Sequence, residues 1–197
     1  MNTQSHAIIN LFLLRKIFGE KKHNIPYFHR LVIFGSILPD LPMFLFFFYY
    51  TFLGVAQETI WGELFFRNDW QVMFNMFNSI PLFLGVILIA VIIKNKSVLV
   101  FGLATIMHFI GDMFLHQEEG HAYFFPLSDY KYHSPVSYWN PEYFGGIFSV
   151  FEIFLILVLS IPLWKGLKNK WARTLIVLVN LFNIFSWLLW YVIFMVF

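Results

Sequence analysis

Long hydrophobic stretches separated by polar connections dominate this chain, and the pattern predicts helices that cross a membrane. The apolar stretches cover residues 31–53, 78–93, 97–115, 147–164 and 174–196. Each approaches the roughly 20 residues that a helix needs to cross about 30 Å of hydrocarbon, and the shorter ones need tilt or local thinning of the bilayer. We therefore predict an all-α fold, a polytopic transmembrane helical bundle of about five spanning helices.

The stretch from His6 to Phe18 is also apolar, but it is too short to span because a helix of this length rises only about 20 Å. Residues 7–14 are apolar nearly all round, whereas a helix lying on the membrane surface would show a polar face. We expect a short, half-inserted helix that enters the bilayer from Arg15 and Lys16, so that its start lies at mid-depth. An amphipathic helix on the cytoplasmic surface is the alternative.

Prolines interrupt the first long apolar stretch. Pro39 and Pro42 lie inside it, where each removes a backbone donor and should break the helix around Asp40. A break is tolerated in a membrane only where the freed backbone groups face protein or water, so this segment should face the bundle interior. Pro81 suits the first turn of its helix, and the sequence shows neither a second broken helix nor an inverted repeat.

The composition supports a membrane protein and limits its chemistry. Hydrophobic residues make up 59% of the 197 residues and charged residues 12%, against roughly 25% charged in soluble domains. No polar segment is long enough to form a second core, which predicts a single integral membrane domain over residues 1–197. The lipid bilayer is the expected partner, nucleic acid is not, and the oligomeric state is left open. Because the chain has no Cys, a metal would need His, Asp or Glu ligands.

The lysines and arginines predict the orientation of the bundle. Eleven of the thirteen fall in or beside alternate connections, residues 16–30, 94–96 and 165–173, which should be cytoplasmic. The remaining two lie in loops 54–70 and 116–146, which also carry most of the acidic residues and should be external.

Five ionisable side chains lie inside the predicted helices, where each is costly and is a candidate for function: His6, Asp40, His108, Asp112 and Glu152. Counting ~1.5 Å per residue from the nearest basic residue places them at ~14 to ~24 Å, in the middle-to-outer part of one bilayer. We expect the two histidines and two aspartates to converge as metal ligands. Taken singly, Asp40 could cap the broken helix, His6 could be an unimportant terminal residue, and Glu152 could pair with a basic side chain or be protonated.

A helical stripe carries three of the candidate groups. His108, Asp112 and His116 are spaced at i, i+4 and i+8, which places them on one face of a helix. Neutral imidazole and carboxylate suit zinc or another divalent metal, and a catalytic site would use three protein ligands and keep one position open for water. The alternative is that His108 and Asp112 only hydrogen-bond across a turn and seal the bundle.

The outward loop 116–146 is rich in His, Tyr, Phe and Pro for a connector. Loops of this length are commonly functional or disordered, and the aromatic residues favour order. We expect an ordered lid from which His121 reaches back to the site as a ligand or an acid–base group. The alternative is an aromatic belt at the membrane interface, formed by Tyr123, Phe124, Phe125, Tyr138 and Trp139.

Four short motifs follow one another along the chain up to about residue 128: Thr3 with His6, Leu38-Pro39-Asp40, His108 with Asp112, and His121 with Phe125-Pro126. Their order and spacing resemble the LexA-regulated, membrane-bound metal-dependent hydrolase family, a group of small bacterial inner-membrane proteins. The resemblance implies a multi-pass protein of the bacterial plasma membrane that hydrolyses its substrate with a metal. Where many family members carry Thr-His-Ser, this chain has Asn78-Ser79, so one expected histidine is absent.

A fainter similarity links these residues to the zinc-dependent phospholipase C and P1-type nuclease enzymes, whose metal clusters also use an N-terminal amine or His, an Asp and an HxxxD helix. The resulting hypothesis is a membrane-bound metal-dependent hydrolase acting on a lipid phosphoester, with zinc as the expected cofactor. The candidate groups for acid–base catalysis or extra ligation are His116, His121 and Glu152. The alternatives are a transporter or ion-handling protein with a mid-membrane relay, and a non-catalytic membrane scaffold.

Overall fold

The structure, a computed structural model, describes residues 1–138 and 140–196, and no β-strand occurs among them. The all-α fold class is confirmed. Five helical segments are long and apolar enough to cross a membrane, as predicted: Phe28–Phe52, Asn68–Ile92, Lys96–Met113, Gly145–Gly166 and Lys170–Leu188. Trp139, assigned above to the aromatic loop, lies outside the described residues.

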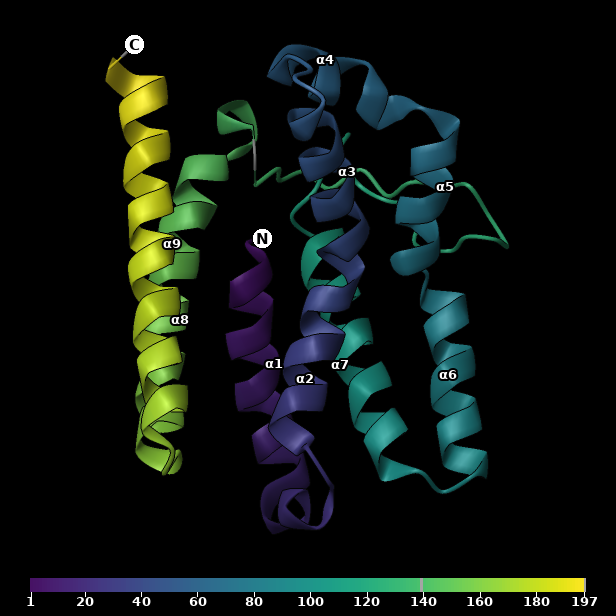
Figure 1. Cartoon of the computed structure of the whole chain (residues 1–197), viewed down its shortest axis with the longest axis vertical. Coiled ribbons are helices and arrows are strands. Elements are labelled where there is room, and N and C mark those ends of the chain that lie inside the picture. Colours follow the sequence, from purple (N-terminus) through teal and green to yellow (C-terminus); the bar gives the residue numbers. More distant parts are fainter. Residues whose placement is uncertain (139, 197) are drawn as a thin grey trace.

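The α-helices are α1 (Thr3–Phe18), α2 (Phe28–Ile37), α3 (Leu41–Phe52), α4 (Gln57–Gly62), α5 (Asn68–Phe77), α6 (Ile80–Ile92), α7 (Lys96–Met113), α8 (Gly145–Gly166) and α9 (Lys170–Val196) (Figure 1). Short 3₁₀ turns connect some of them: η1 (Gly19–Asn24), η2 (Leu38–Asp40), η3 (Leu64–Phe66) and η4 (Pro141–Tyr143). The predicted loop 54–70 is therefore largely helical, since it contains α4, η3 and the start of α5.

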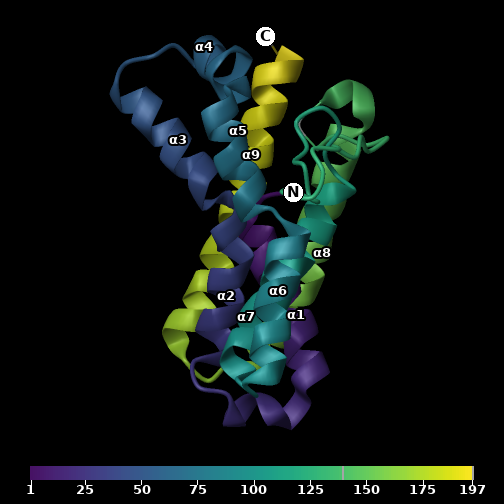
Figure 2. The ribbon, with the colours of Figure 1, turned by 90° about the vertical axis from the view of Figure 1, so that its right-hand side faces the viewer.

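Helix α1 stands inside the bundle beside α2, α7 and α8 (Figures 1 and 2). Its polar Asn10 is buried and donates to the Ser36 hydroxyl and to the Ala104 carbonyl, each at 2.9 Å, so it ties α1 to α2 and α7. The expectation of an inserted helix fits this packing, and the alternative of a helix lying on the surface does not.

Two of the five segments are interrupted, and the interruptions meet. The first lies at η2, between α2 and α3, as the prolines predicted. The second separates α5 from α6, so the expectation of a single broken helix is wrong. Ser79 starts α6 by accepting a hydrogen bond from Leu82 N–H, with Pro81 in the first turn. The side-chain amide of Asn78, within the second interruption, donates to the Pro39 carbonyl at 3.3 Å.

A layer of aromatic residues lies beyond these interruptions. Helices α3, α4 and α5 sit together above the ends of α2 and α6 (Figure 2). They bury a cluster of Phe46, Ile60, Phe65 and Phe74, in which the Phe46 and Phe74 rings meet edge to face at 5.5 Å. This layer closes one side of the space above α1 and α7.

The loop 116–146 closes another side and is hydrogen-bonded to the helices. Ala122 N–H donates to the Asn75 side chain at 3.0 Å, and Ile80 N–H donates to the Tyr123 carbonyl at 2.8 Å. Tyr123 is 1% exposed, so this part of the loop is packed inside the molecule rather than tethered loosely above it. The arrangement agrees with the lid that the aromatic sequence predicted.

Close packing of α2 on α7 depends on a glycine. A Cβ at Gly35 would come within 2.6 Å of the Phe101 carbonyl oxygen, so only glycine lets the two helices approach this closely. The short interhelical distance brings the end of α2 against His108 of α7.

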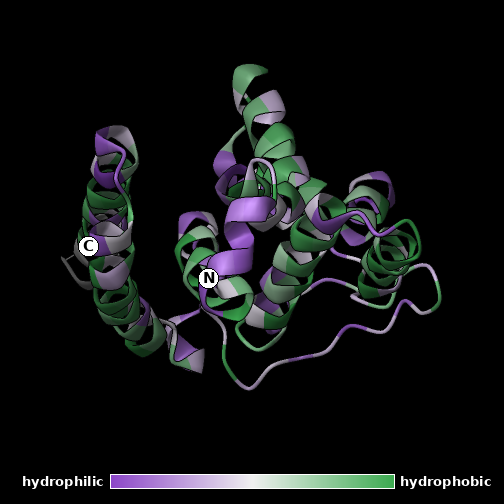
Figure 3. Cartoon of the chain, turned by 90° about the horizontal axis from the view of Figure 1, so that it is seen from below, coloured by the Kyte–Doolittle hydropathy of each residue, from purple (hydrophilic) through white to green (hydrophobic). Residues whose placement is uncertain are grey.

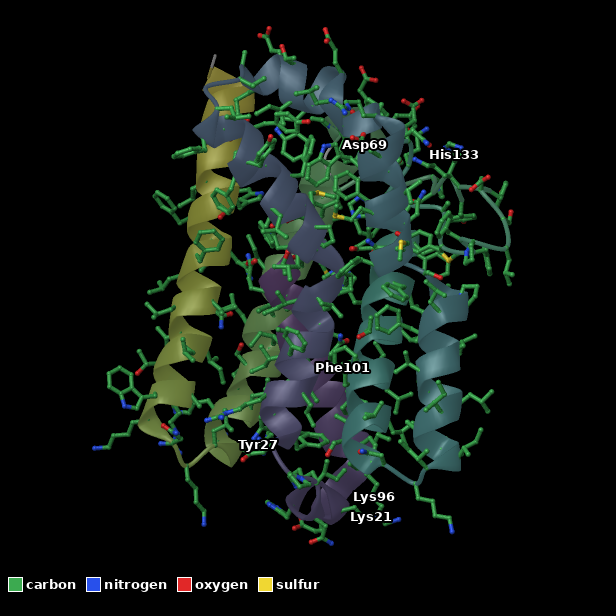
Figure 4. The ribbon with its side chains drawn as sticks, turned by 45° about the vertical axis from the view of Figure 1, so that its right-hand side comes forward. Lys21, Tyr27, Asp69, Lys96, Phe101 and His133 are labelled. Carbon is green, nitrogen blue, oxygen red and sulfur yellow. The ribbon has the colours of Figure 1, made fainter. Side chains whose placement is uncertain are left out.

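The outer surface of the bundle is hydrophobic (Figure 3). Large apolar side chains stay exposed on several helices, including Phe52 of α3, Leu88 of α6, Phe154 of α8 and Phe182 of α9. Surfaces of this kind suit lipid and would favour aggregation in water. Lys21 and Lys96 lie at one end of the molecule, and Asp69 and His133 at the other (Figure 4), which matches the charge distribution used to predict orientation.

Candidate metal centre

The first turn of α1 is held from several sides. Thr3 Oγ1 donates to Asp40 Oδ2 at 2.5 Å, and the side-chain amide of Asn2 donates to the Tyr138 hydroxyl at 2.6 Å. His6 follows in the same helix and is 1% exposed. His6 is therefore buried in an anchored helix and does not lie at a frayed chain start, and its role as a ligand stays a prediction.

The orientation of His108 is fixed by a backbone group. Its Nδ1 lies 2.7 Å from the Ser36 carbonyl oxygen. Because a carbonyl oxygen only accepts, Nδ1 carries the proton, and in the neutral ring Nε2 holds the lone pair that a metal needs. Ser36 belongs to the last four residues of α2, whose carbonyls lack partners within their helix, so the break at Pro39 provides this acceptor.

Asp112 lies one turn after His108 on α7 and contacts both histidines. Its Oδ2 is 3.0 Å from His108 Nε2, and its Oδ1 is 2.8 Å from His6 Nε2. The two imidazole rings stack with centroids 3.7 Å apart. One ligand atom from each of the three buried residues lies within 4.8 Å of the others, a spacing at which one ion could contact all three.

Asp40 completes the predicted group of four. Its Oδ1 lies 3.4 Å from His108 Nε2, and its Oδ2 accepts the hydrogen bond from Thr3. The side chain does not cap α3, so the alternative reading of Asp40 as a helix cap is wrong. The structure thus brings His6, His108 and Asp112 within reach of one ion and places Asp40, from η2, beside His108.

This donor set fits a divalent cation. His108 Nε2 is buried 3.0 Å from Asp112 Oδ2 and 3.4 Å from Asp40 Oδ1, without hydrogen-bond geometry to either. The short distance to Asp112 fits both a pair that seals the bundle and two ligands of one shared ion. Two carboxylates this close to each other need positive charge beside them, and the N-terminal ammonium, 3.1 Å from Asp112 Oδ1, supplies part of it. A bound cation would satisfy all of them at once, and imidazole nitrogen with carboxylate oxygen is a ligand set that zinc takes in proteins.

His116 adjoins this group at the end of α7. Its Nε2 lies 3.4 Å from Asp112 Oδ1, and its Nδ1 lies 3.3 Å from Glu119 Oε1. Burial and the N-terminal ammonium oppose protonation of His116, but Asp112 and Glu119 outweigh them and raise its pKa. Burial would raise the pKa of Glu119, but hydrogen bonds from His116 and Ser137 lower it to about 2, so Glu119 is a carboxylate that orients the imidazole.

Three polar atoms near the centre are buried without a hydrogen-bond partner: Asn78 Oδ1, His121 Nδ1 and the Tyr123 hydroxyl. The charges of Asp40 and Asp112 influence both His121 and Tyr123, which places the loop within electrostatic reach of the ligands. Burial lowers the pKa of His121 to about 4 and raises the pKa of Tyr123, so both are neutral at pH 7. Because buried polar atoms are normally paired, these three are available to a ligand.

Glu152 comes from α8 and is 4% exposed. Its Oε1 accepts from Asn2 N–H at 3.2 Å, and its Oε2 is buried without a partner. It stands outside the group of four, but with His6 it lines a cavity of about 220 Å³. Its role in the site remains a prediction.

Sequence reasoning missed the groups that orient the ligands. Glu119 could have been found from its i, i+3 spacing to His116, whereas the Ser36 carbonyl has no side-chain signal. Gly111 was also missed, although a Cβ there would lie 3.0 Å from His6 Cε1. Glycine at this position is what lets the His6 ring lie flat against α7.

Comparison with known proteins finds no matching family model, no similar curated protein and no similar solved structure. Inference about function therefore depends on the geometry of the centre and on the four short motifs of the sequence.

Proposed function

We propose that this protein is a membrane-bound metal-dependent hydrolase that cleaves a lipid phosphoester, with a divalent metal, zinc by the chemistry of its ligands, held by His6, Asp40, His108 and Asp112. The observation that carries the proposal is the convergence of three buried ligand atoms, from His6, His108 and Asp112, within 4.8 Å of one another. Asp40 Oδ1 lies beside them, 3.4 Å from His108 Nε2. The resemblance to the LexA-regulated hydrolase family adds support from the same residues.

The chemistry follows from what each group can do. A divalent ion held by His6, Asp40, His108 and Asp112 would supply a water activated for hydrolysis near neutral pH. Hydrolysis breaks the ester P–O bond, takes one proton from the water and returns one to the leaving oxygen. His121 is neutral and has a free Nδ1 to accept the first proton, while the Tyr123 hydroxyl can donate a hydrogen bond to the phosphoryl oxygens.

The location of the centre fits a lipid substrate. The ligands belong to helices that are long and apolar enough to span a membrane, or to α1 between them. Charge counting places the same residues in the middle-to-outer part of the bilayer, at ~14 to ~24 Å from the basic end. A lipid phosphoester could reach this depth without leaving the membrane.

The experiment is to measure metal content and hydrolysis on one detergent-purified preparation. We expect bound zinc in the wild type and release of phosphate from phosphatidic acid, both lost in H108A and D112N. H121A should keep its metal and lose roughly 10²–10⁴-fold in rate, the usual contribution of an acid–base group. H133A is the matched control, because His133 is an exposed histidine of the same loop. Full activity in D112N would contradict the proposal.

A second candidate is a transporter for divalent cations, and one observation favours it. Two interrupted spans meet at the site through the hydrogen bond from Asn78 to Pro39, and broken helices often form ion sites in transporters. Zinc uptake into proteoliposomes, abolished in D112N and without any phosphoester turnover, would support this function over hydrolysis. A wild-type protein that binds no metal would contradict both the hydrolase and the cation transporter and would favour the non-catalytic membrane scaffold.

A further inference from the structure

A cavity of about 220 Å³ lies between α1, α7 and α8, and the four proposed ligands do not account for its apolar wall. Its wall is mostly apolar, with Ile9 from α1, Met107 from α7, and Phe148, Phe151 and Leu155 from α8. Protein interiors are close-packed and rarely keep voids of this size. The cavity is therefore a space that a ligand can fill.

The cavity opens sideways, toward the membrane. Phe151 forms part of its wall and is also 57% exposed, so the cavity reaches the outer surface of the bundle. Helices α7 and α8 lie on opposite sides of α1 (Figure 1), and both contribute residues to the wall of the cavity. Both helices are long and apolar enough to span a membrane, so hydrocarbon would surround this opening.

The inner end of the cavity reaches the metal centre. His6 and Gly111 line it, and His6 is also one of the four proposed ligands. Glu152 lines it as well, with a buried Oε2 that has no partner. The cavity therefore has a polar end at the centre and an apolar end at the lipid.

We propose that this cavity holds one hydrocarbon chain of a lipid that enters from the bilayer between α7 and α8, with its polar group toward His6 and Glu152. The inference rests on the proposed function only in making that lipid the substrate. An unbranched chain suits the apolar wall, where sugars or charged groups would lose their hydration without gaining partners. Because the cavity opens toward the bilayer, the hydrocarbon chain of the lipid would pass from one apolar environment to another without contacting water.

The first test compares two tryptophan variants on α8. L155W should fill the cavity, because Leu155 is part of its wall. L157W is the control, because Leu157 is two residues away, 42% exposed and outside the wall. L155W should lower kcat/KM for a long-chain phosphatidic acid by roughly tenfold or more and leave a short-chain analogue unchanged, as a filled chain site requires. L157W should change neither. Equal loss on both substrates in L155W would overturn the inference.

A second test does not depend on hydrolysis. A trace of phosphatidic acid with a diazirine at its chain end, in phosphatidylglycerol vesicles, is photolysed with the full-length protein and the labelled peptides are mapped. We expect labelling of the 148–155 segment that disappears in L155W, or in M107W if L155W does not fold, and persists in L157W. Equal labelling in every variant would contradict the chain site. Specific labelling together with no hydrolysis would support the binding of a hydrocarbon chain in the cavity and contradict the proposed hydrolase activity.

Discussion

The candidate ligands and His116 are each oriented by a second group that hydrogen-bonds to the same side chain. The Ser36 carbonyl fixes the proton of His108, the Glu119 carboxylate orients His116, and the Thr3 hydroxyl holds Asp40. Partners of this kind set the tautomer and direction of metal ligands and affect affinity nearly as strongly as the ligands do. Substitutions of residues that orient the ligands, without being ligands themselves, should therefore weaken metal binding.

The hydroxyl of Thr3 is predicted to support metal binding through Asp40. T3V keeps the shape of the side chain but removes the donor to Asp40 Oδ2. We expect metal affinity to fall by roughly tenfold, measured by competition with a chelator in detergent. T174V is the control, because Thr174 bonds only the Lys170 carbonyl of its own exposed helix. Unchanged affinity in T3V would show that Asp40 is not a ligand.

The absence of a side chain at Gly111 is predicted to be necessary for the position of the His6 ring. A Cβ at Gly111 would lie 3.0 Å from His6 Cε1 and 3.3 Å from His6 Nδ1, so alanine must displace the ring. G111A should weaken metal binding while the protein stays folded, at a stability cost of about 1–3 kcal/mol. G85A, where nothing lies within 4 Å of the added Cβ, should bind metal normally. Titration of both variants with zinc separates the two outcomes.

Helix ends, rather than helix faces alone, build the site at the scale of elements. The interruption between α2 and α3 contributes Asp40 and the Ser36 carbonyl, and the interruption before α6 contributes Asn78. Loop residues then cover the opening by bonding to α5 and α6. Two properties of the elements can be tested: the orientation of the helices across the membrane, and the hydrogen bonds that hold the loop against α5 and α6.

Orientation is predicted from the basic connections. Single cysteines can be introduced because the chain has none of its own. A membrane-impermeant maleimide should label E142C in intact cells and should label K168C only after permeabilisation, since Lys168 belongs to the basic connection expected in the cytoplasm. Both positions are exposed, so accessibility of the side chain does not bias the comparison. Labelling of K168C in intact cells would reverse the topology.

The loop is predicted to depend on Asn75. This side chain is buried and accepts the hydrogen bond from Ala122 N–H at 3.0 Å. N75A leaves that amide unpaired, which costs about 1–3 kcal/mol, so trypsin should cleave after Lys131 several-fold faster in native detergent solution. N24A, which changes an exposed asparagine far from the loop, is the control. Equal cleavage rates in N75A and the wild type would mean that Ala122 does not hold the loop.

The sequence predicted the spans and the four converging residues because lipid leaves few choices. An ionisable group such as Asp112 inside an apolar helix must find a partner, so a shared place in the middle-to-outer part of the bilayer was enough to expect His6 and His108 beside it. The start of α6 near residue 78 was predicted, with Pro81 in its first turn, but α5 before it was not, because the polar residues of 68–77 hid a helix that continues the same span. The Ser36 carbonyl could not be predicted, since backbone acceptors depend on how α2 meets α7.

At the scale of the whole molecule, three parts meet at one place. The candidate metal centre lies where α1 begins and α7 ends, α3 to α5 and the loop lie beyond it, and the cavity adjoins it at His6 (Figures 1 and 2). Under the proposed function, a bilayer lipid would reach the centre from the side and the loop would limit access of water. A hydrolase for a membrane-resident phosphoester needs both features.

X-ray absorption at the zinc edge, on detergent-purified protein loaded with one equivalent of zinc, tests whether these residues form a metal centre. The spectrum should show a first shell of nitrogen and oxygen only, at ~2.0–2.2 Å, with the outer scattering of imidazole from His6 and His108. The same signal should be absent from D112N. A wild-type protein that retains no more zinc than D112N, or a shell without imidazole, would contradict the metal centre and the hydrolase built on it.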